Sequence, residues 1–504
     1  MPDWGQASTF LSEQCQTGCM NSEEATHEVP KGTENRSTTP GSDTFKHYIS
    51  SQWADRAEEI PAPREQASFA AARRAELSKK YPGKRLVIPA GAMKRRSNDT
   101  FFHFRADSAF SWLTGWGSDS EPDSVLVMEP TASGHESTLY FRERAGRDSD
   151  EFYANSDIGE FWIGPRPSLT QVAGDLGIAT RHLDELPAKD AEVTELPSDL
   201  AQDLSEMRLV KDEFEINEMR EAVAASIRGF ADIARVLPAI AGNQRGERLV
   251  EGAFASRARL EGNGVGYNTI AASGAHACIL HWVTNDGVVN DGDLILIDAG
   301  VERDSYYTAD VTRTLPVNGT FTPIQRKVYE AVREAADAAF AMVKPGITFR
   351  DVHNTAMGVI AKKTAEWGLL PVTAEEALLP ENGHHRRYMV HGTSHHLGID
   401  VHDCAQARRE MYMDGIVKEG MIFTIEPGLY FQPDDLTVPE EYRGIGVRIE
   451  DDILVTATGA ENLTIALPRT ADDVEAWLAP HAAAAKAQKA AQIKADALAK
   501  KKRK

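Results

Sequence analysis

The sequence predicts a chain of two mixed α/β domains, and three observations support this prediction. The 504 residues exceed the usual size of a single domain. Short apolar runs alternate with helical patterns up to about residue 205. After that a long amphipathic helix opens a second region, whose apolar strands end on acidic residues or lie near histidines. Apolar residues make up 42% of the chain, which is ordinary for a globular protein.

The first part of the chain divides into a polar segment and a small domain. Residues 1–65 are rich in Ser, Thr, Gly, Glu and Pro, so we expect them to be mostly disordered. A short amphipathic piece over residues 45–53 is expected to dock on the folded body. The domain that follows spans 66–205. Its predicted strands are the apolar runs 85–89, 124–128 and 137–141, and periodicity predicts a helix over 169–176.

The second domain is expected over residues 206–475. It begins with a predicted helix, because apolar residues from Ile216 to Leu237 recur mostly three or four positions apart. Another helix is predicted after Pro323, a residue favoured at a helix start. Residues 476–504 are rich in Ala and Lys and have almost no core face. We expect a solvated, frayed tail there, and an electrostatic contact with an acidic partner is the alternative.

Composition limits the class of function. The net charge of -21 argues against a nucleic-acid binder, which needs a basic face. Cys15, Cys19, Cys278 and Cys404 form no zinc-like pair, which indicates a reducing compartment. The chain has no apolar run near the about 18 residues of a membrane span, and its first residues lack signal-peptide features. We therefore expect a cytoplasmic protein that binds neither nucleic acid nor membrane.

Two apolar segments bring a pair of carboxylates together. The run 294–297 ends on Asp298, and a buried strand ends on an acid only if something compensates the charge. After a turn, residues 307–313 alternate so that Thr308, Asp310 and Thr312 share a face. A hairpin of these segments would set Asp298 beside Asp310, and a divalent ion would remove their repulsion. The alternative is two surface acids on a solvated hairpin.

Histidines are enriched in one segment. His391, His395, His396 and His402 fall within the twelve residues 391–402. Imidazole serves both as a metal ligand and as a proton carrier near neutral pH. Any one of these side chains could instead be a hydrogen-bonded core histidine, but the cluster favours a site.

Two more apolar strands carry acids. The run 421–425 ends on Glu426 before a Pro-Gly turn, and Thr424 and Glu426 share a face. In the segment 446–452, Arg448 and Glu450 share a face. That arginine could simply neutralise the acid in an ion pair. The same device, an acid or histidine on an otherwise buried strand, thus occurs four times.

Together these segments predict a metal site. The candidate ligands are Asp298, Asp310, His395, Glu426 and Glu450. Four carboxylates and one imidazole suit two hard or borderline divalent ions with a hydroxide between them better than a structural zinc ion. If the five side chains converge, the protein is a hydrolase.

The motifs also resemble a known family. IDAG followed by DVTRT, HGTSHHLGIDVHD, TIEPGLY and RGIGVRIEDD are similar to those of the pita-bread metallopeptidases, in the branch of Xaa-Pro aminopeptidase and prolidase. The resemblance spans roughly residues 66–475. It implies a C-terminal pita-bread (creatinase/aminopeptidase) catalytic domain with a smaller N-terminal α/β creatinase-like domain. It also implies a homodimer or homotetramer.

The resemblance implies roles for the metal ligands. Two manganese ions per subunit are expected, and Co²⁺ or Zn²⁺ could replace them. Asp310 and Glu450 would bridge the ions, Asp298 would hold one, and His395 and Glu426 would complete the other. Two departures from the family pattern stand out: the gap between Asp298 and Asp310 is one residue longer than usual, and position 396 is a histidine where relatives often have an aromatic residue. Spacing from His391 and His402 favours His395 as the ligand.

Other residues match positions near the substrate. By resemblance, His281 orients the substrate, His391 and His402 line the cleft and assist proton transfer, and Arg448 lies beside a bridging acid. Tyr430 is expected to form a wall of the proline pocket. Trp162 is similar to an aromatic residue that can reach a neighbouring subunit's cleft, and ordinary core packing is the alternative.

The expected activity is removal of the first residue from peptides with proline in second position. A hydroxide between the ions would attack the carbonyl before proline, Glu426 would take the proton, and His391 or His402 would stabilise the oxyanion. Prolidase, which cleaves only dipeptides, is the alternative within the same chemistry. An inactive pita-bread binding module is the alternative from another class, but such relatives lose ligand positions. Methionine aminopeptidase is disfavoured because it normally lacks the N-terminal domain.

Overall fold

The computed structural model describes residues 39–98 and 100–502. The disorder expected for residues 1–38, and with it Cys15 and Cys19, lies outside the described residues. The chain divides into two compact units: Met1–Ala57 with Arg144–Arg166, and Glu58–Glu143 with Pro167–Lys504. This division assigns residues 144–166 of the first expected domain to the smaller unit and keeps the rest of both expected domains in the larger one, so the boundaries near residues 65, 205 and 475 stay predictions.

The smaller unit holds three short helices, α1 (Asp43–Ser50), α4 (Asp150–Ala154) and α5 (Glu160–Ile163). Ser42 begins α1 by accepting a hydrogen bond from Phe45 N, as an N-cap serine does. Phe45 then packs edge-on against Tyr153, with 5.6 Å between ring centroids. The amphipathic piece expected over residues 45–53 thus docks on the segment around α4.

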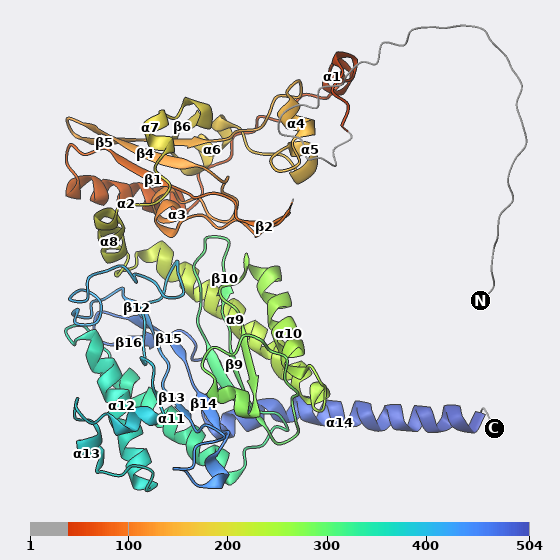
Figure 1. The fold of residues 1–504 in the computed structure, drawn as a ribbon, viewed down its shortest axis with the longest axis vertical. Coiled ribbons are helices and arrows are strands. Elements are labelled where there is room, and N and C mark those ends of the chain that lie inside the picture. Colours follow the sequence, from red (N-terminus) through yellow and green to blue (C-terminus); the bar gives the residue numbers. More distant parts are fainter. Residues whose placement is uncertain (1–38, 99, 503–504) are drawn as a thin grey trace, which may run out of the picture. The chain divides into compact units, whose positions relative to one another are not determined.

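The first part of the larger unit is a four-stranded sheet in the order β1-β4-β5-β6 (Figure 1). Its strands are β1 (Leu86–Pro89), β4 (Val125–Thr131), β5 (Gly134–Phe141) and β6 (Ala179–His182). Only β5 and β6 pair in parallel. A two-stranded ribbon, β2 (Arg95–Ser97) and β3 (Thr100–Phe101), lies outside this sheet. The helices are α2 (Gln66–Lys80), α3 (Ser108–Thr114), α6 (Leu169–Leu176), α7 (Ala188–Ala191) and α8 (Ser198–Met207), with a 3-10 turn η1 (Leu183–Glu185).

Two pairs of long helices pack in the second part of this unit. Capping boxes occur at the start of α9 (Glu213–Ile240), where Asp212 pairs with Glu215, and of α11 (Pro323–Met342), where Thr322 pairs with Gln325. Pro323 occupies the first turn of α11, as the sequence predicts. The pairs are α9 (Glu213–Ile240) with α10 (Gly246–Glu261), and α11 (Pro323–Met342) with α12 (Phe349–Glu366) (Figure 1).

Short strands and turns connect these helices. The strands are β7 (Gly264–Val265), β8 (Ile270–Ser273), β9 (Leu294–Asp298), β10 (Val301–Glu302), β11 (Thr312–Pro316), β12 (Ile422–Ile425), β13 (Gly428–Tyr430), β14 (Gly446–Arg448), β15 (Asp451–Val455) and β16 (Ala460–Asn462). The short helical pieces are η2 (Gly274–Cys278), α13 (Ala374–Ala377), η3 (His384–Arg387) and η4 (Glu440–Tyr442). Three-stranded sheets form in the orders β11-β9-β8 and β12-β15-β16, and two-stranded ones as β10-β7 and β13-β14.

Two strand predictions were wrong in detail. The strand expected over 307–313 begins only at Thr312, so Asp310 precedes it; Asp310 N bonds the Asp452 side chain at 3.2 Å instead of a neighbouring strand. The segment expected as one strand over 446–452 is split into β14 and β15 at Ile449–Glu450. The chain changes partner there, because β14 pairs with β13 and β15 pairs with β12.

The C-terminal helix α14 (Ala471–Lys502) begins in the core and ends outside it. Ala471, Val474 and Leu478 are buried with the main apolar cluster, whereas residues 479–487 are half-buried or exposed. No helix in the described part of the chain combines the length and apolar character of a membrane span.

Candidate functional site

All five predicted ligands line one cavity of about 480 Å³. Besides His395, three further candidate histidines line this cavity: His281, His391 and His402. His396 is not among its lining residues. Its lining residues are Leu280, His281, Asp298, Asp310, His391, Gly392, Ser394, His395, His402, Ala405, Tyr412, Glu426, Arg448 and Glu450.

The hairpin places two acids side by side. Asp298 is the last residue of β9 and lies opposite Thr312, the first residue of β11. Asp310 precedes that strand by two positions and is buried. The Tyr267 hydroxyl lies within hydrogen-bond distance of both acids, at 2.7 Å from Asp298 Oδ1 and closer to Asp310 Oδ1, so its one proton can be donated to either acid. The pairing of the two segments confirms the predicted hairpin.

The other two acids come from the second set of strands. Glu450 lies in the break between β14 and β15, where its backbone N donates to Thr312 O at 3.1 Å. The Thr312 hydroxyl also donates to Glu450 Oε2 at 2.7 Å. Glu426 directly follows β12, and its backbone N donates to Thr393 O at 2.8 Å. These backbone contacts join strands distant in sequence at the point where the acids meet.

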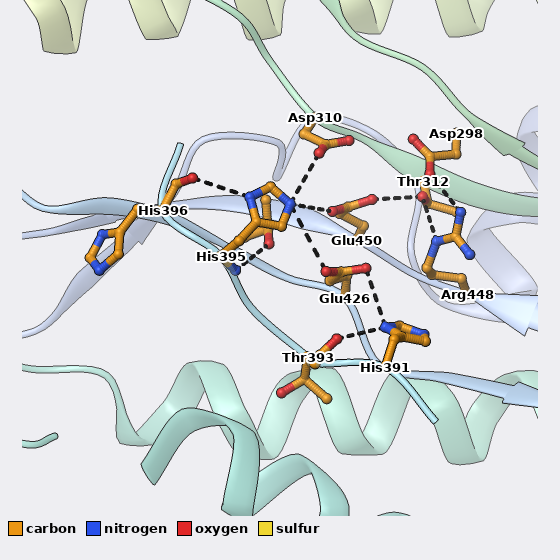
Figure 2. Close-up of polar contacts among 12 residues, drawn as sticks. Asp298, Asp310, Thr312, His391, Thr393, His395, His396, Glu426, Arg448 and Glu450 are labelled. Carbon is orange, nitrogen blue, oxygen red and sulfur yellow. Dashed lines mark hydrogen bonds and ion pairs between the residues drawn. The ribbon is translucent and has the colours of Figure 1, made fainter. Parts of the chain in front are cut away.

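His395 faces the acids and His396 does not. The Nε2 atom of His395 lies 3.2 Å from Asp310 Oδ2, 3.9 Å from Glu426 Oε1 and 4.0 Å from Glu450 Oε1. The neighbouring His396 ring points the opposite way (Figure 2), where it stacks on Phe349. The reason is that the segment runs alongside β12, so successive side chains point to opposite faces.

The ligand atoms form overlapping groups small enough to hold metal ions. Asp298, Asp310 and Glu450 offer atoms within 4.8 Å of one another, and so do His395, Glu426 and Glu450. Asp310 and His395 form a further group with His402. Asp310, His395 and Glu450 each belong to two of these groups, so the three groups adjoin one another.

The electrostatics of these acids fit a cation. Burial, and then the negative charge of Asp298, raises the pKa of Asp310. Burial raises the pKa of Glu426 to about 7, and burial with the charge of Asp310 raises the pKa of Glu450 well above its usual range. Burial alone would lower the pKa of His395, but Asp310 and Glu426 more than offset it and raise it to about 9. The raised pKa values mean that nearby positive charge does not fully compensate the buried carboxylates. Divalent ions would supply that charge and stabilise the anionic forms.

Arg448 provides part of that charge. Its Nη2 atom donates to Asp298 Oδ2 at 2.5 Å and its Nε to Thr312 Oγ1 at 3.1 Å (Figure 2). Its Nη1 donates to the Tyr430 hydroxyl at 3.1 Å. The ion pair considered for Arg448 therefore forms with Asp298 and not with Glu450. One guanidinium does not balance four carboxylates, so the need for further cations remains.

The remaining candidate residues lie on or behind the cavity wall. His281 and His402 are exposed, and the His402 ring lies 4.3 Å from that of His395. His391 is held at both nitrogens, by Gly392 O at 2.6 Å and the Tyr430 hydroxyl at 2.8 Å. Burial and Arg448 lower the pKa of His391 to about 3, so it is neutral. Tyr430 itself is buried behind the wall, and its contact with substrate stays a prediction.

One residue that contacts the candidate ligands was not predicted from the sequence. Tyr267, which bonds two of the candidate ligands, was missed because it lies in a loop without any pattern that marks it.

Trp162 belongs to the smaller unit, where its indole N–H donates to Tyr153 O at 2.8 Å. With 56% of its surface exposed, Trp162 is not a core residue. Its reach into a neighbouring subunit stays a prediction.

Known families match both halves of the chain. Residues 217–457 match the family described as metallopeptidase family M24, and residues 70–198 match the aminopeptidase P N-terminal domain. Xaa-Pro aminopeptidase 1 of Streptomyces coelicolor is 48% identical over 90% of this chain and 96% of its own length. Xaa-Pro aminopeptidase of Escherichia coli is 32% identical over 81% of this chain and 97% of its own.

Solved structures agree with these matches. A variant of E. coli aminopeptidase P in complex with substrate superposes with a TM-score of 0.70 and 29% identity, over 84% of this chain and 99% of that one. The zinc-substituted E. coli enzyme in complex with product gives 0.71 and 30% identity, over 83% and 99%. The coverage includes both domains, so the match is not confined to the strands around the cavity.

Proposed function

The chain belongs to metallopeptidase family M24 and to its Xaa-Pro aminopeptidase group, and on that premise we propose that it removes the first residue from peptides whose second residue is proline. The observation that carries the proposal is the convergence of four acids and His395 on one cavity that His281 and His402 also line. Relatives of this size and identity carry the name Xaa-Pro aminopeptidase.

We assign the metal ligands as the resemblance implies. Asp310 and Glu450 would be shared by two ions, Asp298 would hold one of them, and His395 and Glu426 would hold the other. Support comes from the overlapping groups that these ligand atoms form. Manganese is our first choice, because carboxylate oxygens with one imidazole suit a hard or borderline ion, and cobalt or zinc could replace it.

The chain's own side chains then have defined tasks. When bound, divalent ions in this site supply activation of a water molecule and of the scissile carbonyl. Glu426 accepts the proton that leaves the attacking water and later passes it to the departing proline nitrogen. His402 donates to the oxyanion, because its exposed ring faces the cavity, whereas both nitrogens of His391 are already bonded.

Selection of proline follows from its shape. The nitrogen of the scissile bond carries no N–H, and the ring fixes the local backbone. Leu280, Ala405 and Tyr412 give the cavity an apolar part that can contact the ring. A site that makes no hydrogen bond to that nitrogen accepts the ring without loss. The cytoplasmic location and the homodimer or homotetramer expected from the sequence stay predictions.

The direct test uses three peptides and a metal assay. The purified protein is loaded with Mn²⁺ and incubated with Arg-Pro-Pro, the matched Arg-Ala-Pro and the dipeptide Arg-Pro. We expect free arginine from the first peptide only or mainly, and loss of activity after chelation. Metal content before and after loading reports whether the site holds ions.

The same experiment separates the alternatives. Cleavage of Arg-Pro alone would make the protein a prolidase, which shares the site but not the length preference. Retention of no metal and cleavage of no peptide would favour a binding module and contradict the proposed function. Cleavage of Arg-Ala-Pro at an equal rate would contradict the role of proline.

A further inference from the structure

His281 reaches the cavity from a loop, and its own side chain does not hold it there. The segment 279–293 between η2 and β9 has no regular secondary structure, and it carries Leu280 and His281 to the cavity wall. Among the described residues the His281 side chain has no hydrogen bond or ion pair, and it is exposed. Whatever fixes its position must therefore act on the loop around it.

One buried carboxylate holds that loop from behind. Glu247, in the first turn of α10, has no exposed surface. Its Oε1 accepts hydrogen bonds from Ser273 N and His276 Nδ1, both at 2.8 Å. Its Oε2 accepts from Trp282 Nε1 at 2.9 Å and from Gly287 N at 2.6 Å. No lysine or arginine pairs with Glu247 within the described ranges, so these four donors are what compensate the buried carboxylate.

The four donors lie on both sides of His281 in the sequence. Ser273 and His276 precede it, and Trp282 and Gly287 follow it. The His276 and Trp282 rings also stack on each other, with 3.9 Å between centroids. The carboxylate therefore draws together the two flanks of the segment, and between these flanks Leu280 and His281 line the cavity.

Gly287 shows how closely the loop approaches the carboxylate. A Cβ atom added at Gly287 would lie 2.7 Å from Glu247 Cδ and from both of its carboxylate oxygens. Only glycine lets the backbone N–H come this near. A larger residue at position 287 would therefore move the backbone N–H away from the Glu247 carboxylate.

We propose that Glu247 is the positioning residue for His281, so that its carboxylate determines where the imidazole meets the peptide. Glu247 does not touch the cavity and acts only through the loop. The proposal rests on the proposed function in one respect, the contact of His281 with the substrate. It is independent of the metal ligands, since none of the five forms a hydrogen bond or ion pair with Glu247 in the part of the chain that the structure describes.

The chemistry of the four partners predicts that glutamine cannot replace Glu247. All four are donors: two backbone N–H groups, an indole N–H and an imidazole nitrogen facing an acceptor-only oxygen. In Glu247→Gln the amide NH₂ faces one donor pair in either orientation, so at least one backbone N–H loses its acceptor. The loop then shifts, and a shift near 1 Å at an orienting group costs about 100-fold in rate.

The test is a double-mutant cycle on cleavage of Arg-Pro-Pro by the metal-loaded full chain. We expect Glu247→Gln and His281→Ala each to lower kcat/KM by about 10- to 100-fold. The double variant should be no slower than His281→Ala within about 2-fold, because Glu247 has nothing left to position. Bound metal should be unchanged in all three. A purely structural role would instead multiply the two effects, and that result would overturn the proposal.

Two further variants provide a control and a replacement for this test. Glu261→Gln is the matched control, because Glu261 ends the same helix but forms its ion pairs, among the described residues, with Arg228 and Arg257 near the surface. It should leave kcat/KM unchanged. Trp282→Phe replaces Glu247→Gln in the test if the latter does not fold. It removes one donor to Glu247 and keeps an aromatic ring, so we expect a smaller loss of kcat/KM. That loss should also disappear in a His281→Ala background. An inactive wild type would contradict the proposed function, whereas an active wild type with unaffected Glu247→Gln would overturn only this inference.

Discussion

Asp310 occupies the most crowded position among the acids of the site. Its carboxylate accepts a hydrogen bond from Tyr267, lies 3.2 Å from His395 Nε2 and is raised in pKa by burial and by Asp298. A bridging ligand needs both oxygens as anionic acceptors. The amide of asparagine offers one oxygen and no charge, although its volume is the same.

Asp310→Asn should therefore abolish turnover without unfolding the protein. We expect kcat to fall by at least about 100-fold, since even outer partners of a metal ligand contribute 10- to 100-fold. The metal-free variant should be at least as stable as the metal-free wild type, because one repelling charge is gone. Cleavage of Arg-Pro-Pro and circular dichroism measure both effects. Retained activity would remove Asp310 from its bridging role.

Adjacent histidines should respond to mutation in opposite ways. His396 is fully buried against Phe349, Tyr412 and Phe423, and neither of its ring nitrogens has a hydrogen-bond partner in the part of the chain described. A buried polar atom without a partner costs about 1–3 kcal/mol. His396→Phe should thus raise the free energy of unfolding by about 1 kcal/mol and leave activity intact.

The matched variant is His395→Phe, which should lose activity because His395 faces the acids. Urea unfolding and peptide cleavage of both variants provide the comparison. A less stable His396→Phe would mean that the ring nitrogens bind water or that the larger ring does not fit.

At the scale of single residues, the sequence predicted those site residues whose role shows in the adjacent sequence. An acid that ends an apolar strand, as Asp298 and Glu426 do, is visible as a conflict between burial and charge. Spacing favoured His395 over His396, in agreement with where the two rings point. The contacts of Tyr267 and the pairing of Arg448 with Asp298 were not predictable, because each joins residues from segments far apart in the sequence.

Between elements, a buried ion pair ties the start of α9 to the histidine-rich segment. Lys211 Nζ lies 3.0 Å from Asp403 Oδ2, and both side chains are almost completely buried. Burial alone would raise the pKa of Asp403, but Lys211 and Arg208 more than offset it and lower the pKa. Asp403 directly follows His402, and its backbone N donates to His396 O at 2.9 Å.

Lys211→Met should therefore destabilise the protein, because it removes one of the two cations near the buried Asp403 and leaves Arg208 at 3.3 Å. We expect a loss of about 3 kcal/mol, at the low end for a broken buried pair. Urea unfolding measures it. The matched control is Lys46→Met, whose ion pair with Asp150 has the same 3.0 Å distance but is exposed, so no measurable change is expected. Equal effects would contradict the role of burial.

The contact between α12 and η3 predicts a dependence of stability on pH. Burial, and then Arg386, lowers the pKa of His353 to about 4, and Arg386 Nη1 lies 3.2 Å from its Nε2. The unfolded chain binds a proton at this residue below about pH 6.5, while the folded chain does not. Stability is thus lost as the pH falls from about 6.5 to about 4.

His353→Gln should reduce that loss, since the substituted side chain does not titrate. Urea midpoints of wild type and variant at pH 7.5, 6 and 5 provide the measurement. Parallel curves for the two proteins would show that His353 does not contribute to acid sensitivity.

Elements were predicted best where a local signal starts them. The helices at Leu169–Leu176 and after Pro323 begin at capping residues and follow one apolar stripe, so the pattern alone places them. The strands near Asp310 and Glu450 were misplaced because contacts distant in the sequence determine the backbone there. Asp310 N bonds the Asp452 side chain, and the segment around Glu450 pairs first with β13 and then with β12.

Across the whole molecule, the mixed two-domain architecture and the pita-bread fold followed from the motifs and are confirmed by the matches to both domain families. The attachment of residues 144–166 to the N-terminal unit was not predictable. It depends on aromatic contacts such as Trp53 against Phe152, which join segments about a hundred residues apart in a polar part of the sequence.

Metal removal should lower the stability of the whole chain, not only its activity. The candidate ligands extend from Asp298 to Glu450, so the unfolded chain offers no assembled site and ions bind the folded state alone. Ions at 100 to 1,000 times their dissociation constant contribute about 2.7–4.1 kcal/mol. Chelation should thus lower Tm by several degrees, and Mn²⁺ should restore it. Asp310→Asn should show a smaller shift than wild type. If chelation empties the site without changing Tm, the five side chains do not hold the ions.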